Sequence, residues 1–204
     1  MLMTSRITIG PLVPDDFGPL FCWVNDVAAA RLDFAYRPVD MMAHQQWWDG
    51  LGKDPHKVVF AIRKAADTAI IGYVQITGIN IVHRSAELGI RIGEEKNRGQ
   101  GYGKEAIRLA VDFCWNHLNL NRVQLIVFKH NQRAIGAYKT AGFRREGVLR
   151  KAAFIGGEWV DLTIMAALRP PHTRKQRAAA GPRVLTAVAV TSDISAAPVQ
   201  RRIA

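Results

Sequence analysis

The feature that most constrains this chain is a glycine-rich run, Arg98-Gly99-Gln100-Gly101-Tyr102-Gly103-Lys104. An extended stretch, residues 86–92, precedes it. From Glu105 to His117, apolar side chains recur every three or four positions, as on one face of a helix. Glycines have no Cβ, so backbone N–H groups can close on a bound group, and a helix start adds partial positive charge. The run therefore predicts a strand, a turn and a helix start that together bind an anion, above all a phosphate.

Two familiar phosphate-binding loops do not fit this run. Arg98 stands where the dinucleotide fingerprint requires its first glycine, and no Ser or Thr follows Lys104 as a Walker loop requires. The spacing that remains is arginine, two residues, glycine, one residue, glycine. On this run alone, an ordinary glycine-rich turn stays open as the alternative.

Length and composition predict one domain with a real core, since the chain has 204 residues, of which 49% are hydrophobic. The apolar runs are too short to span a membrane, and residues 1–10 lack the apolar block of a secretory signal, so we expect a cytoplasmic protein with no membrane partner. The two cysteines, Cys22 and Cys114, are expected to be reduced core thiols. The six histidines form no close ligand pair, and no metal site is predicted.

The positive charge is concentrated near the C-terminus. The formal net charge is +11, and residues 169–204 hold seven Lys or Arg against the single Asp193. We therefore expect one folded domain over residues 1–169 and a disordered, basic Ala/Pro/Arg-rich tail over residues 170–204. Net charge alone supports a second class of function, a ribosome- or nucleic-acid-binding module, but no specific nucleic-acid partner is expected.

The order of elements predicts a mixed α/β fold with helices flanking a sheet. Strands are expected at residues 7–9, 58–63, 70–77, 85–92 and 123–128, followed by a terminal hairpin of 152–155 and 159–166. Helices are expected from residue 14 to about 27, from 38 to about 51, over 105–117 and over 131–141.

A second constellation begins at Asn131, just after the buried strand. Asn131 is a good helix N-cap residue, and Tyr138, seven residues further on, lies on the same helix face. A phenol there could reach a leaving group held beside the sheet. The alternative is a core tyrosine with its hydroxyl hydrogen-bonded.

Both segments resemble the cofactor motifs of one family, the GNAT N-acetyltransferases. The run at Arg98 is similar to the family's loop for the pyrophosphate of acetyl-CoA, and Asn131 with the segment Tyr138-Lys139-Thr140-Ala141-Gly142-Phe143 resembles its second motif. Residues 79–88 and 147–157 are similar to the branch that holds ribosomal-protein and spermidine acetyltransferases. The resemblance covers about residues 7–168. It is specific for the family and not for the substrate.

The resemblance implies an acetyl-CoA-dependent acyltransferase, without a metal, that moves the acetyl group directly to a primary amine. It also implies a mostly antiparallel central sheet in which two strands splay apart, so that the pantetheine arm pairs with one of them and a backbone N–H polarises the thioester carbonyl. Tyr138 matches the general acid for the departing CoA thiolate. The cofactor-binding positions implied are Ile90, Arg91, Ile92, Arg98, Gly99, Gln100, Gly101, Tyr102, Gly103, Lys104, Asn131, Ala134 and Tyr138.

The base that removes the proton from the ammonium substrate is less clear from the sequence. A carboxylate near the splayed strands would serve, directly or through water. Glu87, on the strand that leads to the cofactor, is the first candidate, and Glu146, after the second motif, is the other. For either residue, a salt bridge with one of the many arginines is the alternative.

The amine substrate is left open among protein N-termini, polyamines, nucleotide-linked amino sugars and small amines. In this family the substrate pocket is built largely from the first two helices, where Phe34, Tyr36 and Trp47 are the predicted substrate contacts. This region is aromatic and mixed in charge, which counts against a polycation, whereas Arg31 and Arg37 would tolerate an anionic substrate. Core packing is the alternative for Trp47. The terminal strands of this branch often lie near dimer contacts, so a homodimer is possible.

Overall fold

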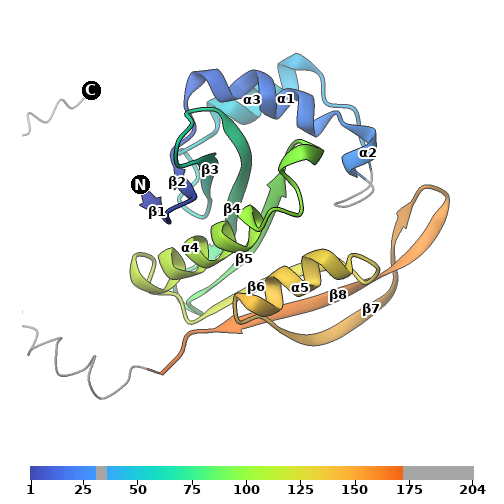
Figure 1. Ribbon diagram of the computed structural model, residues 1–204. Helices are drawn as coiled ribbons and strands as arrows, with labels where there is room; N and C mark the ends of the chain where they lie inside the picture. The colour runs from blue at the N-terminus through green and yellow to red at the C-terminus, as the bar shows by residue number, and fades with distance from the viewer. Residues whose placement is uncertain (31–35, 172–204) are drawn as a thin grey trace, which may run out of the picture. The chain divides into compact units, whose positions relative to one another are not determined.

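A single eight-stranded sheet organises the chain, with its strands in the order β1-β2-β3-β4-β5-β6-β8-β7 (Figure 1). All neighbouring strands are antiparallel except β5 and β6, which are parallel. The strands are β1 (Leu2–Met3), β2 (Ile7–Gly10), β3 (Val58–Lys64), β4 (Ile70–Asn80), β5 (Ser85–Ile92), β6 (Arg122–Phe128), β7 (Arg144–Ile155) and β8 (Glu158–Leu168). The predicted mixed α/β class with a mostly antiparallel sheet is confirmed.

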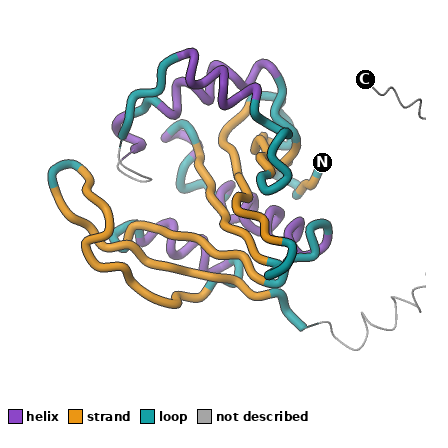
Figure 2. Tube along the Cα trace, turned by 180° about the vertical axis from the view of Figure 1, so that it is seen from behind, coloured by secondary structure: helices purple, strands orange, loops and turns teal. Residues whose placement is uncertain are grey.

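The structure is a computed structural model that describes residues 1–30 and 36–171. Its helices are η1 (Pro14–Asp16), α1 (Phe17–Val24), α2 (Val27–Ala30), α3 (Met41–Asp49), η2 (Glu95–Asn97), α4 (Tyr102–Asn116) and α5 (Gln132–Thr140) (Figure 2). By its contacts the chain divides into a compact unit of residues 1–169 and a second unit of 170–204. The predicted tail lies outside the described residues except for Pro170 and Pro171. Within the described residues, no helix is both long and apolar enough to cross a bilayer.

Strand register assigns each side chain to one face of the sheet. On one face, Val74, Ile76 and Leu88 join the apolar core with the buried side of α4, which includes Ile107 and Ala110. On the other face, the paired positions of β4 and β5 carry polar side chains except at Gly89. These pairs are Tyr73 with Arg91, Gln75 with Gly89, and Thr77 with Glu87.

Two contacts hold η1 and α1 against β3 and β5 on the polar face of the sheet. Asp16 of η1 is buried and accepts two hydrogen bonds from the Arg63 guanidinium, at 3.0 and 2.7 Å. The carbonyl of Trp23 in α1 accepts a hydrogen bond from Arg91 on β5. Removing one partner of a buried pair such as Asp16–Arg63 typically costs about 3–5 kcal/mol, so this contact fixes α1 over the sheet.

Several element boundaries differ from those predicted. The helix expected from residue 14 to about 27 ends at Val24, because the Asn25 side chain bonds the Val39 backbone in both directions. Helix α4 starts three residues early, at Tyr102, because Gly101 adopts a left-handed conformation with φ of 89° and caps the helix there. Strand β7 begins at Arg144 rather than at residue 152. Most of its side chains are exposed, so it lacks the apolar alternation by which a strand is recognised.

The two cysteines have different environments, and the prediction that both are core thiols is wrong for one. Cys114 lies on the buried face of α4, and burial raises the pKa of its thiol to about 12. Cys22 is exposed, because it lies on the outer side of α1 while Leu20 and Trp23 face inward. Cys114 is therefore an unreactive packing residue.

Candidate functional site

The site is built around the divergence of β5 and β6. These strands pair at only three positions, Ser85 with Arg122, Ala86 with Val123, and Glu87 with Gln124. Beyond Glu87, β5 stays paired with β4 as far as Ile92, and β6 stays paired with β8 as far as Phe128. The β5 edge from Leu88 to Ile92 therefore faces the gap. An extended ligand can hydrogen-bond to such an edge as an added strand.

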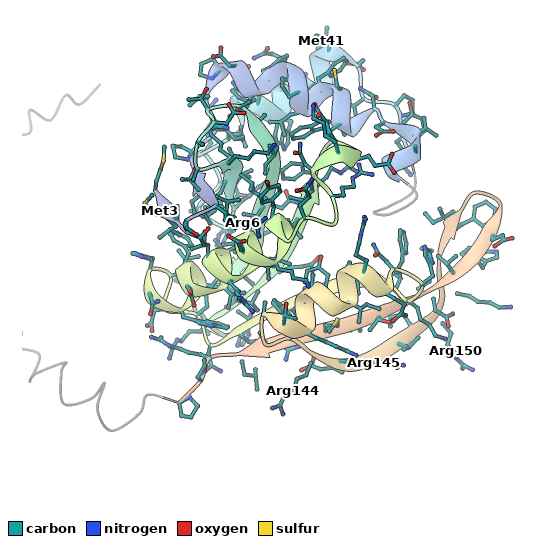
Figure 3. The ribbon with its side chains drawn as sticks, viewed as in Figure 1. Met3, Arg6, Met41, Arg144, Arg145 and Arg150 are labelled. Carbon is teal, nitrogen blue, oxygen red and sulfur yellow. The ribbon has the colours of Figure 1, made fainter. Side chains whose placement is uncertain are left out.

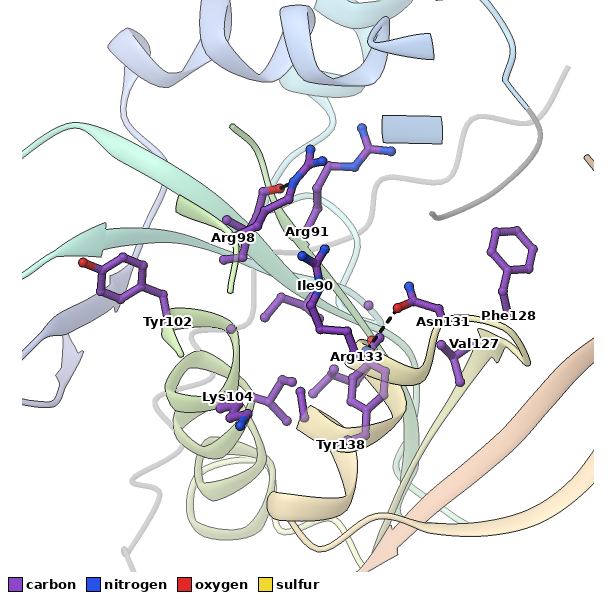
Figure 4. Close-up of a pocket in the computed structure, with 18 of the residues that line it drawn as sticks. Ile90, Arg91, Arg98, Tyr102, Lys104, Val127, Phe128, Asn131, Arg133 and Tyr138 are labelled. Carbon is purple, nitrogen blue, oxygen red and sulfur yellow. Dashed lines mark hydrogen bonds between the residues drawn. The ribbon is translucent and has the colours of Figure 1, made fainter. Parts of the chain in front are cut away.

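A cavity of about 520 Å³ fills this gap. Four groups of residues line it, namely the polar face of β4 and β5, the glycine-rich run, the end of β6 and the first two turns of α5 (Figure 4). Of the thirteen predicted cofactor-binding positions, the cavity brings together twelve. They are Ile90, Arg91, Ile92, Arg98, Gly99, Gly101, Tyr102, Gly103, Lys104, Asn131, Ala134 and Tyr138.

The glycine-rich run presents bare backbone to the cavity. Gly99 and Gly101 have φ of 77° and 89°, values that side chains with a Cβ rarely adopt. No side chain caps the start of α4, so none competes for the first N–H groups of this 15-residue helix. A Cβ added at Gly99 would meet no described atom within 4 Å, so that side of the run is open. This arrangement can hold an anionic group by hydrogen bonds and by the helix dipole.

Arg98 holds the run against the end of β5. Its Nε donates a hydrogen bond to the Ile92 carbonyl at 3.1 Å, and its Nη2 donates to the Gly93 carbonyl. Arg98 thus lines the cavity while its guanidinium is bonded to protein. These hydrogen bonds fix the position of the glycine-rich run relative to the open β5 edge.

Gln100 is the one predicted cofactor-binding position that does not line the cavity. It is exposed, and its side-chain amide donates to the Lys96 carbonyl at 2.9 Å. Its own carbonyl accepts a hydrogen bond from Arg6, which also pairs with Glu105 at 3.0 Å. Figure 3 shows Arg6 beside the start of α4, where its guanidinium lies 4.9 Å from the centre of the Tyr102 ring.

Helix α5 brings Asn131 and Tyr138 to the cavity. The Asn131 side chain accepts a hydrogen bond from the Ala134 N–H at 3.1 Å, which confirms Asn131 as the helix N-cap. Tyr138, two turns on, is 7% exposed, and its ring lies 5.8 Å from that of Phe143. Tyr138 therefore belongs to the core and also lines the cavity.

Glu87 stands at the last paired position before β5 and β6 separate. It lines the cavity on the polar face of the sheet, opposite Thr77 and beside Gln124. Tyr138 reaches the cavity from α5, which packs on the apolar face. The carboxylate and the phenol therefore approach the gap between the strands from opposite faces of the sheet.

Glu146, the other candidate base, is not brought to the cavity. It lies on β7, where its carboxylate accepts two hydrogen bonds from the Arg122 guanidinium, at 2.8 and 2.6 Å. These hydrogen bonds hold the pKa of Glu146 below its usual value. This is the salt bridge that the sequence left open as the alternative.

Of the three predicted substrate contacts, two do not line the cavity and one lies outside the described residues. Phe34 falls outside the described residues. Tyr36 is exposed and does not line the cavity. Trp47 stacks on the buried His44 with ring centres 5.3 Å apart, and Lys57 lies 5.7 Å from its indole ring. Trp47 thus packs within the layer formed by α1 and α3, which is the packing role that the sequence left open as its alternative.

The structure adds cavity residues that were not identified from the sequence. Gln75 and Thr77 line it because the β4–β5 register places them beside Gly89 and Glu87. Arg133, the second residue of α5, also lines it. Arg133 could have been identified as a cavity residue because it lies two positions after Asn131. Gln75 and Thr77 could not, because the strand register cannot be read from one sequence. Within the described residues, no group of His, Cys, Asp and Glu could hold a metal ion.

The chain is similar in sequence and in structure to known N-acetyltransferases. Over 110 residues the chain is 34% identical to spermidine N(1)-acetyltransferase of Vibrio cholerae, and the match covers 54% of this chain and 63% of that relative, less than two thirds of its length. A crystal structure of spermidine N-acetyltransferase from Vibrio cholerae in complex with CoA and spermine superposes with a TM-score of 0.75 at 28% identity, covering 81% of this chain and 96% of that one. A dodecameric structure of spermidine N-acetyltransferase from the same organism superposes with a TM-score of 0.68 at 27% identity, covering 81% and 95%.

The sequence also matches the family described as acetyltransferase (GNAT) domain over residues 6–144. This stretch runs from just before β2 to the first residue of β7, and so contains the diverging strands, the glycine-rich run and α5. The match spans more than half of the chain and includes every element that shapes the cavity. This protein belongs to the GNAT acetyltransferase family.

Proposed function

We propose that this protein transfers an acetyl group from acetyl-CoA directly to a primary amine. One observation carries the proposal, namely that an open strand edge, an anion-binding helix start and a buried tyrosine line the same cavity. Family membership and the CoA-bound relative support the same donor. The alternative, a module that binds acetyl-CoA without robust catalysis, has the same donor site and differs only in turnover.

The residues of the cavity fit acetyl-CoA from end to end. The backbone of residues 99–103 and the start of α4 would hold the diphosphate. The edge of β5 from Leu88 to Ile92 would pair with the extended pantetheine arm. A backbone N–H of that edge would then donate a hydrogen bond to the thioester carbonyl, where negative charge develops during acyl transfer.

Two side chains would handle the protons. Glu87, directly or through a water molecule, would accept a proton from the substrate ammonium, because only the neutral amine can attack. The amine nitrogen then bonds to the acetyl carbon, the carbon–sulfur bond breaks, and the nitrogen releases its second proton to solvent to give the neutral amide. Tyr138 would give its proton to the departing sulfur, since a phenol with a usual pKa of about 10 is protonated at neutral pH.

For the acceptor, we propose an amine that presents a single ammonium near Glu87. Among the described residues that line the cavity, Glu87 is the one carboxylate, whereas Arg91, Arg98, Lys104 and Arg133 are cationic. The relative from Vibrio cholerae is named for spermidine, so a polyamine is included among the amines to be assayed. An assay of released CoA with spermidine, an alanyl peptide, an amino sugar and small amines identifies the class.

We also propose that the protein self-associates through the β7–β8 hairpin. Strand β7 is the last strand of the sheet, and two aromatic side chains at the hairpin tip, Phe154 and Trp159, are 52% and 63% exposed. Their rings lie 5.3 Å apart and form an exposed aromatic pair. The relative whose structure is dodecameric supports self-association, and the exposed aromatic pair is the reason to place it at this hairpin.

Gly101→Val is expected to weaken acetyl-CoA binding by about 10-fold or more, because a β-branched residue is strained at φ of 89° and would shift the backbone that is proposed to hold the diphosphate. Isothermal titration calorimetry measures the affinity. Gly156→Val is the matched control, since Gly156 also has a positive φ, 59°, but lies in the β7–β8 turn away from the cavity. Unchanged affinity in the Gly101 variant would refute the donor assignment.

Tyr138→Phe is expected to lower kcat by about 10- to 1000-fold, because the ring and its packing remain while the proton donor is lost. The weak end of this range applies if water can replace the phenol. The affinity for acetyl-CoA and the melting temperature should change little. The assay is steady-state kinetics with the best amine of the panel. A variant that turns over like the parent would make Tyr138 a packing residue only.

Glu87→Gln is expected to lower kcat/KM for the amine by about 100-fold or more at neutral pH, because an amide cannot take the proton. The deficit should shrink as the pH rises, since more of the amine is then already neutral. Glu146→Gln serves as the matched control and should retain the activity of the parent. Equal effects of the two substitutions, or a deficit in Glu87→Gln that does not depend on pH, would show that Glu87 is not the base.

A further inference from the structure

The peptide unit between Gln100 and Gly101 connects the cavity to a residue outside it. The carbonyl of this unit, on Gln100, accepts a hydrogen bond from Arg6 Nη2 at 2.7 Å, and neither of these residues lines the cavity. The C=O and N–H groups of a planar trans peptide point in opposite directions, so the Gly101 N–H points away from Arg6. Gly101 lines the cavity, and its N–H has no hydrogen-bond partner among the described residues. This N–H is therefore available to a ligand in the cavity.

The backbone of Arg6 is anchored to the sheet, independently of the glycine-rich run. Its N–H donates a hydrogen bond to the Thr4 hydroxyl at 3.1 Å, and its carbonyl accepts one from the Ala65 N–H, just after β3, at 2.8 Å. Arg6 and Gln100 are 94 positions apart in the chain, so the fold alone brings them together. The sheet thus supplies a fixed point from which a side chain reaches the run.

The Arg6 guanidinium joins the run to the first turn of α4. Its Nη1 pairs with Glu105 at 3.0 Å, while its Nη2 holds the Gln100 carbonyl. The guanidinium carbon lies 4.9 Å from the centre of the Tyr102 ring, and a Cβ built at Gly101 would lie 3.4 Å from Nη1. The planar fork of an arginine can make both hydrogen bonds at once. It therefore fixes the peptide unit relative to the helix start.

We propose that Arg6 is a positioning residue that directs the Gly101 N–H toward the diphosphate of acetyl-CoA. This role rests on the proposed use of acetyl-CoA as the donor. A hydrogen bond from a cation to the Gln100 carbonyl polarises the peptide, so the N–H at its other end becomes a stronger donor to an anion. Arg6 acts through the backbone, from outside the cavity.

The exposure of the Arg6 side chain separates this role from a contribution to folding. Arg6 is 48% exposed and its partner Glu105 is 19% exposed. An ion pair that is open to solvent contributes little to stability. Loss of the guanidinium should therefore change the affinity for the donor far more than the melting temperature.

The test measures acetyl-CoA binding to the full-length chain by isothermal titration calorimetry. Arg6→Ala is expected to weaken binding by about 5- to 20-fold, because the Gly101 N–H loses its orientation toward a charged acceptor. Arg6→Lys should recover part of the loss, since an ammonium can hold the Gln100 carbonyl but lacks the fork. In steady-state kinetics, Arg6→Ala should raise the KM for acetyl-CoA and leave kcat and the KM for the amine within about 2-fold of the parent. A loss of folded protein would lower kcat instead.

Lys64→Ala is the matched control for the loss of a cation at this position. Lys64 lies on β3 with its ammonium 5.9 Å from the centre of the same Tyr102 ring, and it makes no hydrogen bond to the glycine-rich run within the described part of the chain. This variant should bind acetyl-CoA as the parent does. Unchanged affinity in Arg6→Ala, or an equal loss in Lys64→Ala, would overturn the proposal.

A double variant separates the peptide from the charge of Glu105. Arg6→Ala leaves the Glu105 carboxylate without its cation, and that negative charge alone would repel a diphosphate. Arg6→Ala combined with Glu105→Gln removes the charge and should bind acetyl-CoA as weakly as Arg6→Ala. Recovery of the parental affinity in the double variant would assign the effect to Glu105 and contradict a positioning role. A parent that binds no acetyl-CoA would instead refute the donor itself.

Discussion

The parting of β5 and β6 after three paired residues is the constraint on which the rest of this structure depends. A strand edge inside a fold exposes N–H and C=O groups that must find partners, because unpaired polar groups away from water are costly. Here the edge from Leu88 to Ile92 faces a cavity instead of a strand. Its free hydrogen-bonding groups and the extended shape of the gap define what the cavity can bind.

The gap is held open by contacts on both sides. Gly93, just after β5, donates its N–H to the Ile71 carbonyl at 3.0 Å, and a Cβ at this position would collide with the Trp23 indole, so the strand end is packed tightly against α1 and β4. On the other side, all seven residues of β6 pair with β8, and Lys129 just beyond pairs with Asp161 at 2.9 Å. Because each strand is bonded more extensively to its outer neighbour, the two strands do not close on each other.

Local motifs made much of the site predictable. The glycine-rich run and the Asn131 cap carry their conformation within a few residues, so the exposed backbone at the start of α4 and the helix face that carries Tyr138 could be inferred from spacing. Glu87 was found because β5 is a clear strand next to the run. The roles of Tyr138 and Glu87 in the reaction stay predictions.

Features that depend on pairing between distant segments could not be read from the sequence. Glu146 looked like a candidate base until the fold placed it beside Arg122, which is 24 positions away in the chain. The start of β7 was missed because its exposed side chains do not alternate with buried ones. Gln75 and Thr77 line the cavity only because of the register between β4 and β5. Cys22 was expected in the core, but α1 turns it outward.

Amide hydrogen exchange followed by mass spectrometry tests the central claim most directly. The account predicts that saturating acetyl-CoA slows exchange in the peptides covering residues 88–92 and 99–104, because the donor pairs with the β5 edge and the glycine-rich run. Residues 58–64 of β3, which is paired on both sides, serve as the internal reference. Protection confined to residues 99–104, with residues 88–92 unchanged at saturation, would contradict the claim that the open strand edge binds the donor.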